Sequence, residues 1–244
     1  MARDLSKTNS SLPKAGASSQ GDISAFLKAA SKLKKSEAGN GGLVFAMDAT
    51  MSRQHTWDQA QHIQAEMFGA VEQTGGLDVQ LVYFRGFGEC RASRWVNKPS
   101  ALRDLMSGID CRGGQTQIGK VLSHVRKEAA KKNPLNGQRS RVDALVYVGD
   151  AMEEQVDALC QKAGELGMLK VPCFMFLEGQ DRQAELAFRE VARLSGGAFM
   201  RFGPGAAAKL ADLLKAVARY AAGGRVALEK AGGAADRLLL EQLK

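Results

Sequence analysis

The fold is decided by residues 44–53, which read Val44-Phe45-Ala46-Met47-Asp48-Ala49-Thr50-Met51-Ser52-Arg53. An apolar run ends abruptly at Asp48, and two hydroxyl residues follow at alternate positions. A continuous apolar run is typical of a strand that is covered on both faces. Hard oxygen donors at the end of such a strand favour a small divalent cation such as Mg²⁺. The stretch therefore predicts a buried strand that ends in part of a metal site.

The rest of the chain alternates apolar strands with amphipathic helices. The patterns predict strands at residues 43–47, 77–84, 89–96, 144–148, 171–177 and 198–202. They predict helices at residues 56–73, 101–107, 117–131, 153–166, 182–194 and 206–221. Gly86 and Gly88 mark a hairpin turn, and the polar strand that follows them suits a sheet edge. We therefore expect an α/β fold: a doubly wound, mainly parallel six-stranded sheet with one antiparallel edge strand and helices on both faces.

Composition divides the chain into four segments. Residues 1–20 are rich in Ser, Gly, Ala and Lys, so we expect a disordered basic tail. Residues 21–41 are expected to form a short helix and a glycine-rich linker, and residues 42–222 the main domain. Residues 223–244 are predicted as a C-terminal helical extension, interrupted at Gly232-Gly233. The Leu238-Leu239-Leu240 cluster predicts that this extension docks rather than remaining disordered.

Charge and hydropathy bear on location and on partners. The net charge is +8, and residues 1–40 contribute half of it, with seven Lys/Arg against three Asp/Glu. A basic balance suits nucleic acid, but a solvated basic tail explains it as well. No window approaches the roughly 18 consecutive apolar residues of a membrane span, and the N-terminus lacks the apolar core of a signal peptide. We therefore expect a cytoplasmic protein that has no membrane partner.

The four cysteines, Cys90, Cys111, Cys160 and Cys173, show neither CxxC spacing nor a paired pattern. Such spacing predicts free thiols packed as small hydrophobes rather than a zinc site or a disulfide framework.

Two further oxygen donors are predicted to join the first stretch. Asp150 ends the strand at residues 144–148, and Thr116 lies in a glycine-containing loop just before a helix. Ligands of open α/β sheets bind at the carboxyl ends of the strands. We therefore expect one site with two carboxylates and three hydroxyls, from Asp48, Thr50, Ser52, Thr116 and Asp150. A Mg²⁺ ion held mostly by neutral hydroxyls stays electron-poor and can accept a carboxylate from outside.

These residues and the order of elements resemble von Willebrand factor A domains. Asp48-x-Thr50-x-Ser52, Gly114-x-Thr116 and Asp150 are similar to the metal-ion-dependent adhesion site (MIDAS) of that family, and the resemblance covers roughly residues 42–222. Thr50 stands where the family usually has Ser. Val148-Gly149-Asp150-Ala151 stands where Thr-Asp-Gly is more usual.

The resemblance implies a ligand set and a class of activity. The hydroxyls of Thr50, Ser52 and Thr116 would ligate the metal directly, Asp48 and Asp150 would act largely through water, and an acidic residue of a partner would complete the shell. It implies a non-catalytic module that binds an exposed Asp or Glu of a partner protein through Mg²⁺ or Mn²⁺. Bacterial intracellular members commonly act as adaptors beside chaperones, ATPases or stress-response machinery.

Other readings of the same residues stay open. Asp, Ser and Thr at strand ends also serve as turn formers and helix caps. A nucleic-acid-associated protein could use the basic tail and arginines, namely Arg53, Arg85, Arg91, Arg94 and Arg112. These arginines would equally suit an acidic partner near the site.

A metal-dependent hydrolase is the third possibility, although no GxSxG or GxxxxGK[ST] motif is present and Thr50 replaces the second Asp of haloacid-dehalogenase-like phosphatases. His55 and His62 are seven residues apart on one predicted helix, which favours half-buried packing over catalysis.

Overall fold

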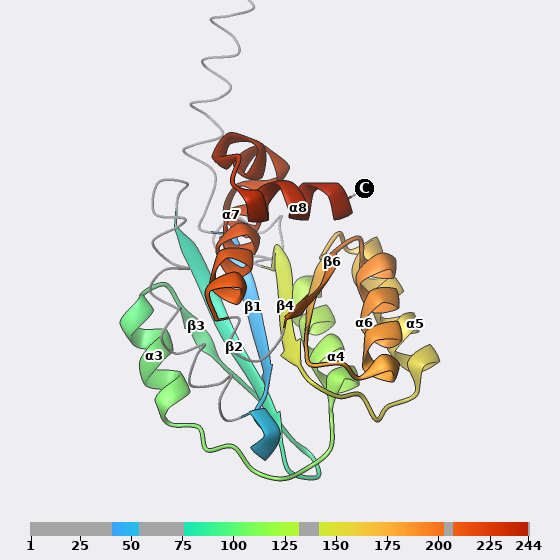
Figure 1. Ribbon diagram of the computed structural model, residues 1–244. Coiled ribbons are helices and arrows are strands. Elements are labelled where there is room, and N and C mark those ends of the chain that lie inside the picture. Colours follow the sequence, from blue (N-terminus) through green and yellow to red (C-terminus); the bar gives the residue numbers. More distant parts are fainter. Residues whose placement is uncertain (1–40, 54–75, 132–141, 203–206, 244) are drawn as a thin grey trace, which may run out of the picture. The chain divides into compact units, whose positions relative to one another are not determined.

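Six strands form the centre of the molecule (Figure 1). The computed structural model describes residues 41–53, 76–131, 142–202 and 207–243. The sheet has the order β3-β2-β1-β4-β5-β6, and every pair is parallel except β2 and β3. This confirms the predicted mainly parallel sheet with one antiparallel edge. The strands are β1 (Gly41–Asp48), β2 (Leu77–Arg85), β3 (Glu89–Val96), β4 (Ala144–Gly149), β5 (Cys173–Glu178) and β6 (Ala198–Phe202).

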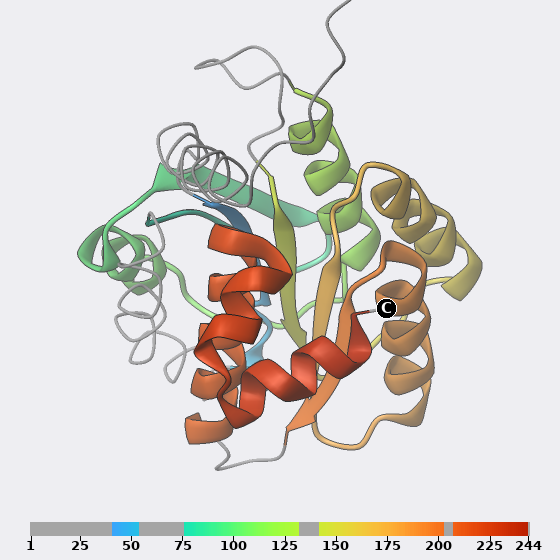
Figure 2. The same cartoon turned by 90° about the horizontal axis from the view of Figure 1, so that it is seen from above.

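Strand β1 is buried along its whole length because helices cover both faces of the sheet. Leu43, Phe45 and Met47 point into one core, and Val44 and Ala46 point into the other. Figure 2 shows the helices divided between the two sides of the sheet. The first core takes side chains from α3 (Pro99–Ser107), α7 (Ala207–Ala231) and α8 (Ala234–Gln242), and the second from α4 (Ile118–Ala130), α5 (Val156–Met168) and α6 (Arg182–Ser195).

The predicted tail at 1–20, the segment 21–40 and the helix at 56–73, with its two histidines, lie outside the described residues. Within the described part of the chain, no helix is long and apolar enough to cross a membrane. The four cysteines are free thiols, as predicted.

The C-terminal segment packs on the same core as the sheet. Helix α7 continues past the predicted end at residue 221 and bends at Gly224, where φ is 63°. Leu228, Leu239 and Leu243 join the first core. The Gln242 side chain accepts a hydrogen bond of 3.0 Å from the backbone N–H of Phe199 in β6. Helix α8 thereby covers part of an edge strand that would otherwise expose an unpaired amide.

One buried ion pair fastens α8 to α7. The Arg219 guanidinium donates to Asp236 Oδ1 at 2.8 Å from Nε, and the Asp236 side chain is 2% exposed. Replacing Arg219 by Met should lower the free energy of unfolding by about 1–3 kcal/mol, because it leaves a buried carboxylate without its cation. Arg126→Met is the control: its ion pair with Glu165 is much more exposed, so removing it should cost less than about 1 kcal/mol. Urea unfolding of both variants tests this, and equal losses would contradict it.

Candidate functional site

The loop that follows β1 folds back on its own aspartate. Asp48 is 1% exposed, and its Oδ1 accepts the backbone N–H of Thr50 at 2.7 Å. This bond curls the chain into a short 3-10 turn, Met51–Arg53. As a result the side-chain oxygens of Thr50 and Ser52 lie 3.1 Å apart. The alternate spacing of the two hydroxyls in the sequence thus becomes a pair of adjacent oxygen atoms.

Asp150 reaches the same rim of the sheet from the neighbouring strand. Strands β1 and β4 are parallel and adjacent, with Met47 opposite Val148. Asp48 therefore lies level with Gly149, and Asp150 follows one residue beyond. Paired strands lie about 4.8 Å apart, so the register brings the two aspartates to adjacent strand ends. Asp150 is partly exposed, whereas Asp48 is buried.

The loop at residues 112–116 connects all three segments. The Arg112 N–H donates to the carbonyl of Ala49 at 2.9 Å, which ties this loop to the one after β1. Thr116 and Glu153 exchange two hydrogen bonds: the Glu153 N–H donates to Thr116 Oγ1 at 3.1 Å, and the Thr116 N–H donates to Glu153 Oε2 at 3.1 Å. Thr116 is thereby fixed to the segment that follows Asp150.

Glu153 and Glu154 are site residues that sequence reasoning missed. Glu154 Oε1 accepts the N–H of Ile118 at 2.5 Å, and Oε2 accepts the N–H of Gly119 at 2.9 Å. The carboxylate therefore caps the positive N-terminus of α4, where Gln117 makes no side-chain cap. Burial raises the pKa of Glu154, while hydrogen bonds from Gly119, Ile118 and Thr116 oppose the rise.

This contact also corrects a predicted boundary. The helix predicted from residue 153 begins at Val156, because the two glutamates are used by the Thr116 segment instead of starting α5. The available signal was the pair of acids three and four residues beyond a strand-ending aspartate.

Two of the predicted donors lie at a spacing that a small octahedral cation could use. Mg²⁺ holds its ligand oxygens at about 2.0–2.1 Å in near-ideal octahedral geometry, so neighbouring ligands lie about 2.9 Å apart. The Thr50 and Ser52 hydroxyls are joined by a hydrogen bond of 3.1 Å, so their oxygens lie close to this spacing. Thr116 Oγ1 accepts one hydrogen bond, from Glu153, and a hydroxyl oxygen has two acceptor lone pairs. Among the described residues no three His, Cys, Asp or Glu side chains group as possible metal ligands.

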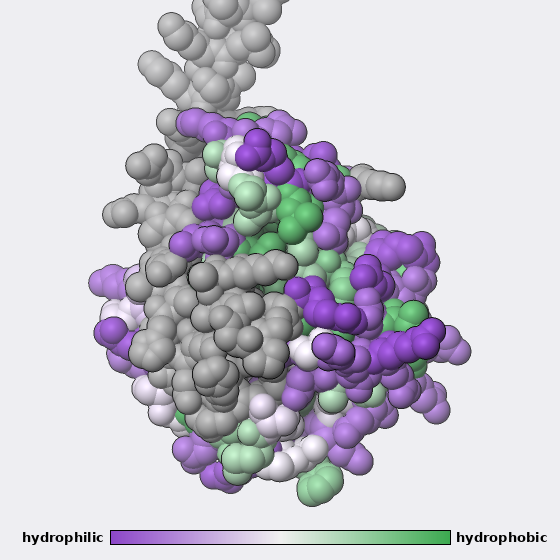
Figure 3. Space-filling model, in the orientation of Figure 1, coloured by the Kyte–Doolittle hydropathy of each residue, from purple (hydrophilic) through white to green (hydrophobic). Residues whose placement is uncertain are grey.

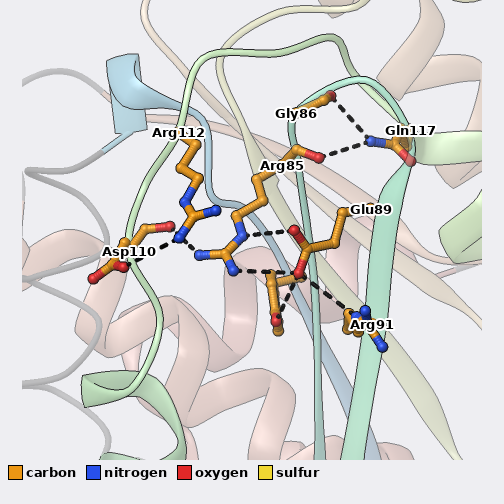
Figure 4. A network of polar contacts seen from close by, with 8 residues as sticks. Arg85, Gly86, Glu89, Arg91, Asp110, Arg112 and Gln117 are labelled. Carbon is orange, nitrogen blue, oxygen red and sulfur yellow. Dashed lines mark hydrogen bonds and ion pairs between the residues drawn. The ribbon is translucent and has the colours of Figure 1, made fainter.

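The arginines near the rim have different roles. Figure 4 shows Arg85 at the centre of a polar network between the β2–β3 hairpin and the segment before the Thr116 loop. Its Nε donates to Glu89 Oε2 at 3.0 Å and its Nη1 to the carbonyl of Asp110 at 2.7 Å, and only 13% of the side chain is exposed. The bonds from Arg85 hold the pKa of Glu89 below its usual value. Arg85 therefore positions the loop and is not free to meet a partner.

The other arginines differ in exposure. The Arg91 and Arg112 side chains are 71% and 60% exposed, and Arg94 is also exposed. The side chain of Arg53 lies outside the described part of the chain. Arg112, on the loop that leads to Thr116, is thus an exposed cation near the predicted ligands.

No protein-family model and no curated protein sequence matches this chain. Solved structures do match its fold. A von Willebrand factor type A protein from Catenulispora acidiphila aligns with a TM-score of 0.57 and 14% identity, over 76% of this chain and 43% of that one. The SpRpn10 VWA domain aligns with a TM-score of 0.57 and 11% identity, over 71% of this chain and 94% of that one.

A third match is a metal-bound structure. Proximal thread matrix protein 1 from the mussel byssus, with a zinc-occupied MIDAS motif, aligns with a TM-score of 0.56 and 16% identity, over 75% of this chain and 48% of that one. This chain thus spans less than half the length of two of these three proteins. At such low identity the likeness concerns the fold. The chain has a von Willebrand factor A-like fold.

Proposed function

We propose that this protein is an interaction module that binds an acidic side chain of a partner protein through Mg²⁺. Asp48, Thr50, Ser52, Thr116 and Asp150 would hold the ion. The observation that carries the proposal is the 3.1 Å spacing of the Thr50 and Ser52 oxygens beside a buried aspartate. The bonds from Arg112 to Ala49 and from Glu153 to Thr116 support it, because they bring the other two segments to the same rim.

The chemistry of the donors favours binding over catalysis. Three of the five proposed ligands are neutral hydroxyls, so they leave the ion with a strong affinity for an additional anionic oxygen. A carboxylate from a partner supplies that oxygen and completes the coordination shell. Bacterial adaptors of this fold family, acting beside chaperones or ATPases in the cytoplasm, are the class of protein that the proposal fits.

Metal binding can be tested without knowing the partner. Asp48→Asn keeps an oxygen that can accept the Thr50 amide but removes the negative charge, and Thr116→Val keeps the shape but removes the hydroxyl. We expect each variant to lose about tenfold or more in affinity for Mn²⁺, followed by electron paramagnetic resonance, and for Mg²⁺, followed by calorimetry. Ser107→Ala is the control, because Ser107 is an exposed hydroxyl at the end of α3 that bonds within its own helix.

Two outcomes would contradict the proposal. Wild-type protein that binds neither ion at millimolar concentration has no such site. Equal affinity in wild type, Asp48→Asn and Thr116→Val would place the metal elsewhere. Steeply salt-dependent binding of DNA or RNA that survives both substitutions would instead support the nucleic-acid hypothesis, and turnover of a phosphate ester that Asp48→Asn abolishes would support the hydrolase.

A further inference from the structure

Two large apolar side chains stand exposed at the rim of the candidate metal site. Phe87 is 87% exposed at the tip of the β2–β3 hairpin, and Met51 is 63% exposed between the proposed ligands Thr50 and Ser52. The other exposed large hydrophobic residues of the described chain lie on helices or directly after one: Met168, Leu169, Leu186, Val226 and Leu238. Figure 3, in the orientation of Figure 1, shows apolar colour at the lower end of the molecule, where the end of β1 and the hairpin lie.

The Thr116 loop contacts both the loop after β1 and the hairpin. The Arg112 N–H donates to the carbonyl of Ala49, and the Gln115 N–H donates to the carbonyl of Gly86 at 3.2 Å. Gly113 and Gly114 connect these two contacts without side chains. A Cβ added to Gly113 would meet nothing within 4 Å, so the loop is open to solvent at Gly113, whereas Gly114 packs against the backbone of Gly86 in the hairpin.

Phe87 is not required by the turn that carries it. Gly86, with φ of +60°, and Gly88, with φ of +159°, supply the unusual backbone conformations of the hairpin tip. The side chain between them is almost fully solvated, so it contributes little to the core. Burying an exposed aromatic side chain against a partner is favourable by about 1.5–3 kcal/mol. A partner that covers Phe87 would gain this binding free energy.

The same loop also presents a cation. The ion pair between Arg112 and Asp110 measures 3.6 Å, and both side chains are more than half exposed. Such surface pairs contribute little, so Arg112 can exchange Asp110 for a carboxylate of a partner at small cost.

We propose that the partner presents its acidic residue in an extended segment with apolar side chains on both sides of the acid. The segment crosses Gly113-Gly114, one apolar side chain contacts Met51, and the other contacts Phe87. This inference rests on the proposed function, because the acid between the two apolar residues is the one that reaches the metal. Met51 and Phe87 then determine specificity among acidic segments.

A random nine-residue peptide library displayed on phage tests the inference with the full chain in Mg²⁺. Wild type should enrich peptides with an Asp or Glu flanked by apolar residues within two positions on each side. The most enriched peptide, synthesised with a fluorescent label, should bind Phe87→Ser and Met51→Ser about tenfold more weakly than wild type. Met168→Ser is the matched control: Met168 is 79% exposed but lies at the end of α5, before β5 begins, and its loss should leave the affinity unchanged.

The outcomes separate this inference from the proposed function. Mg²⁺-dependent enrichment of acidic peptides without apolar flanks, or equal binding to Phe87→Ser and Met168→Ser, overturns the role of the apolar pair and leaves the metal-bridged function standing. Enrichment that is indifferent to chelator and to Asp48→Asn, or no enrichment of acidic peptides, overturns both.

Discussion

Replacing Gly114 by alanine is expected to disrupt the candidate site and to destabilise the fold. A Cβ at this position would lie 2.2 Å from the carbonyl oxygen of Gly86 and 2.4 Å from its nitrogen. Both atoms belong to the backbone of the hairpin, so no side chain can rotate away. The loop and the hairpin must separate, which breaks the bond from Gln115 to Gly86 and displaces Thr116. We expect the free energy of unfolding to fall by about 3 kcal/mol. We also expect Mn²⁺ affinity to fall by about 10–100-fold, which is the effect of substituting residues around metal ligands in other proteins.

The neighbouring glycine supplies the control for this prediction. A Cβ on Gly113 would meet nothing within 4 Å, and the backbone of Gly113 is not in the left-handed conformation that favours glycine. Gly113→Ala should therefore change stability by less than about 0.5 kcal/mol and leave Mn²⁺ binding intact. Urea unfolding and metal titration of the two variants compare the same chemical change at adjacent positions. Similar behaviour of the two would show that the close approach of loop and hairpin does not position Thr116.

Periodicity predicted the sheet well because a strand buried on both faces has few alternative readings. The apolar run at residues 43–47 led to β1 with small boundary errors, and the glycine turn before residues 89–96 led to β3 with none. The start of β1 was missed because Gly41-Gly42 reads as a linker. In the structure Gly41 lies against the backbone of α7, where a Cβ would come within 2.4 Å of the carbonyl of Ala221. Ala221, which leaves no room for a side chain at residue 41, is 180 residues away in the sequence.

The metal-ligand hypothesis was accessible from sequence because the three segments end strands or precede a helix in a known order. The contacts that hold these three segments together could not be predicted from the sequence. Glu153 and Glu154 are favourable residues for the start of a helix, so they were assigned to α5. Their carboxylates bind amides at Thr116, Ile118 and Gly119 instead. In the same way, the five arginines near the predicted rim or its edge could not be told apart from the sequence, because the burial of Arg85 against Glu89 depends on a hairpin geometry that spacing does not specify.

Gly149 marks the departure from the Thr-Asp-Gly pattern of von Willebrand factor A domains, and the core explains it. A Cβ at residue 149 would lie 2.8 Å from Cε1 of Tyr147 and 2.9 Å from its hydroxyl oxygen. The ring cannot retreat easily, since Tyr147 is fully buried, stacks on Phe84 and packs edge-on against Phe188. The large aromatic residue two positions earlier therefore requires glycine before Asp150.

Introducing the residue that is usual at this position should be harmful here. Gly149→Thr should lower the free energy of unfolding by about 3 kcal/mol, because three heavy atoms enter an already filled core. Tyr147→Leu alone should cost about 2–4 kcal/mol through the cavity it leaves. The double variant should lose less than the sum of the two, by more than about 1 kcal/mol, because the smaller side chain makes room for the threonine. Urea unfolding of the four proteins measures this coupling, and strict additivity would mean that the ring of Tyr147 is not what excludes a side chain at residue 149.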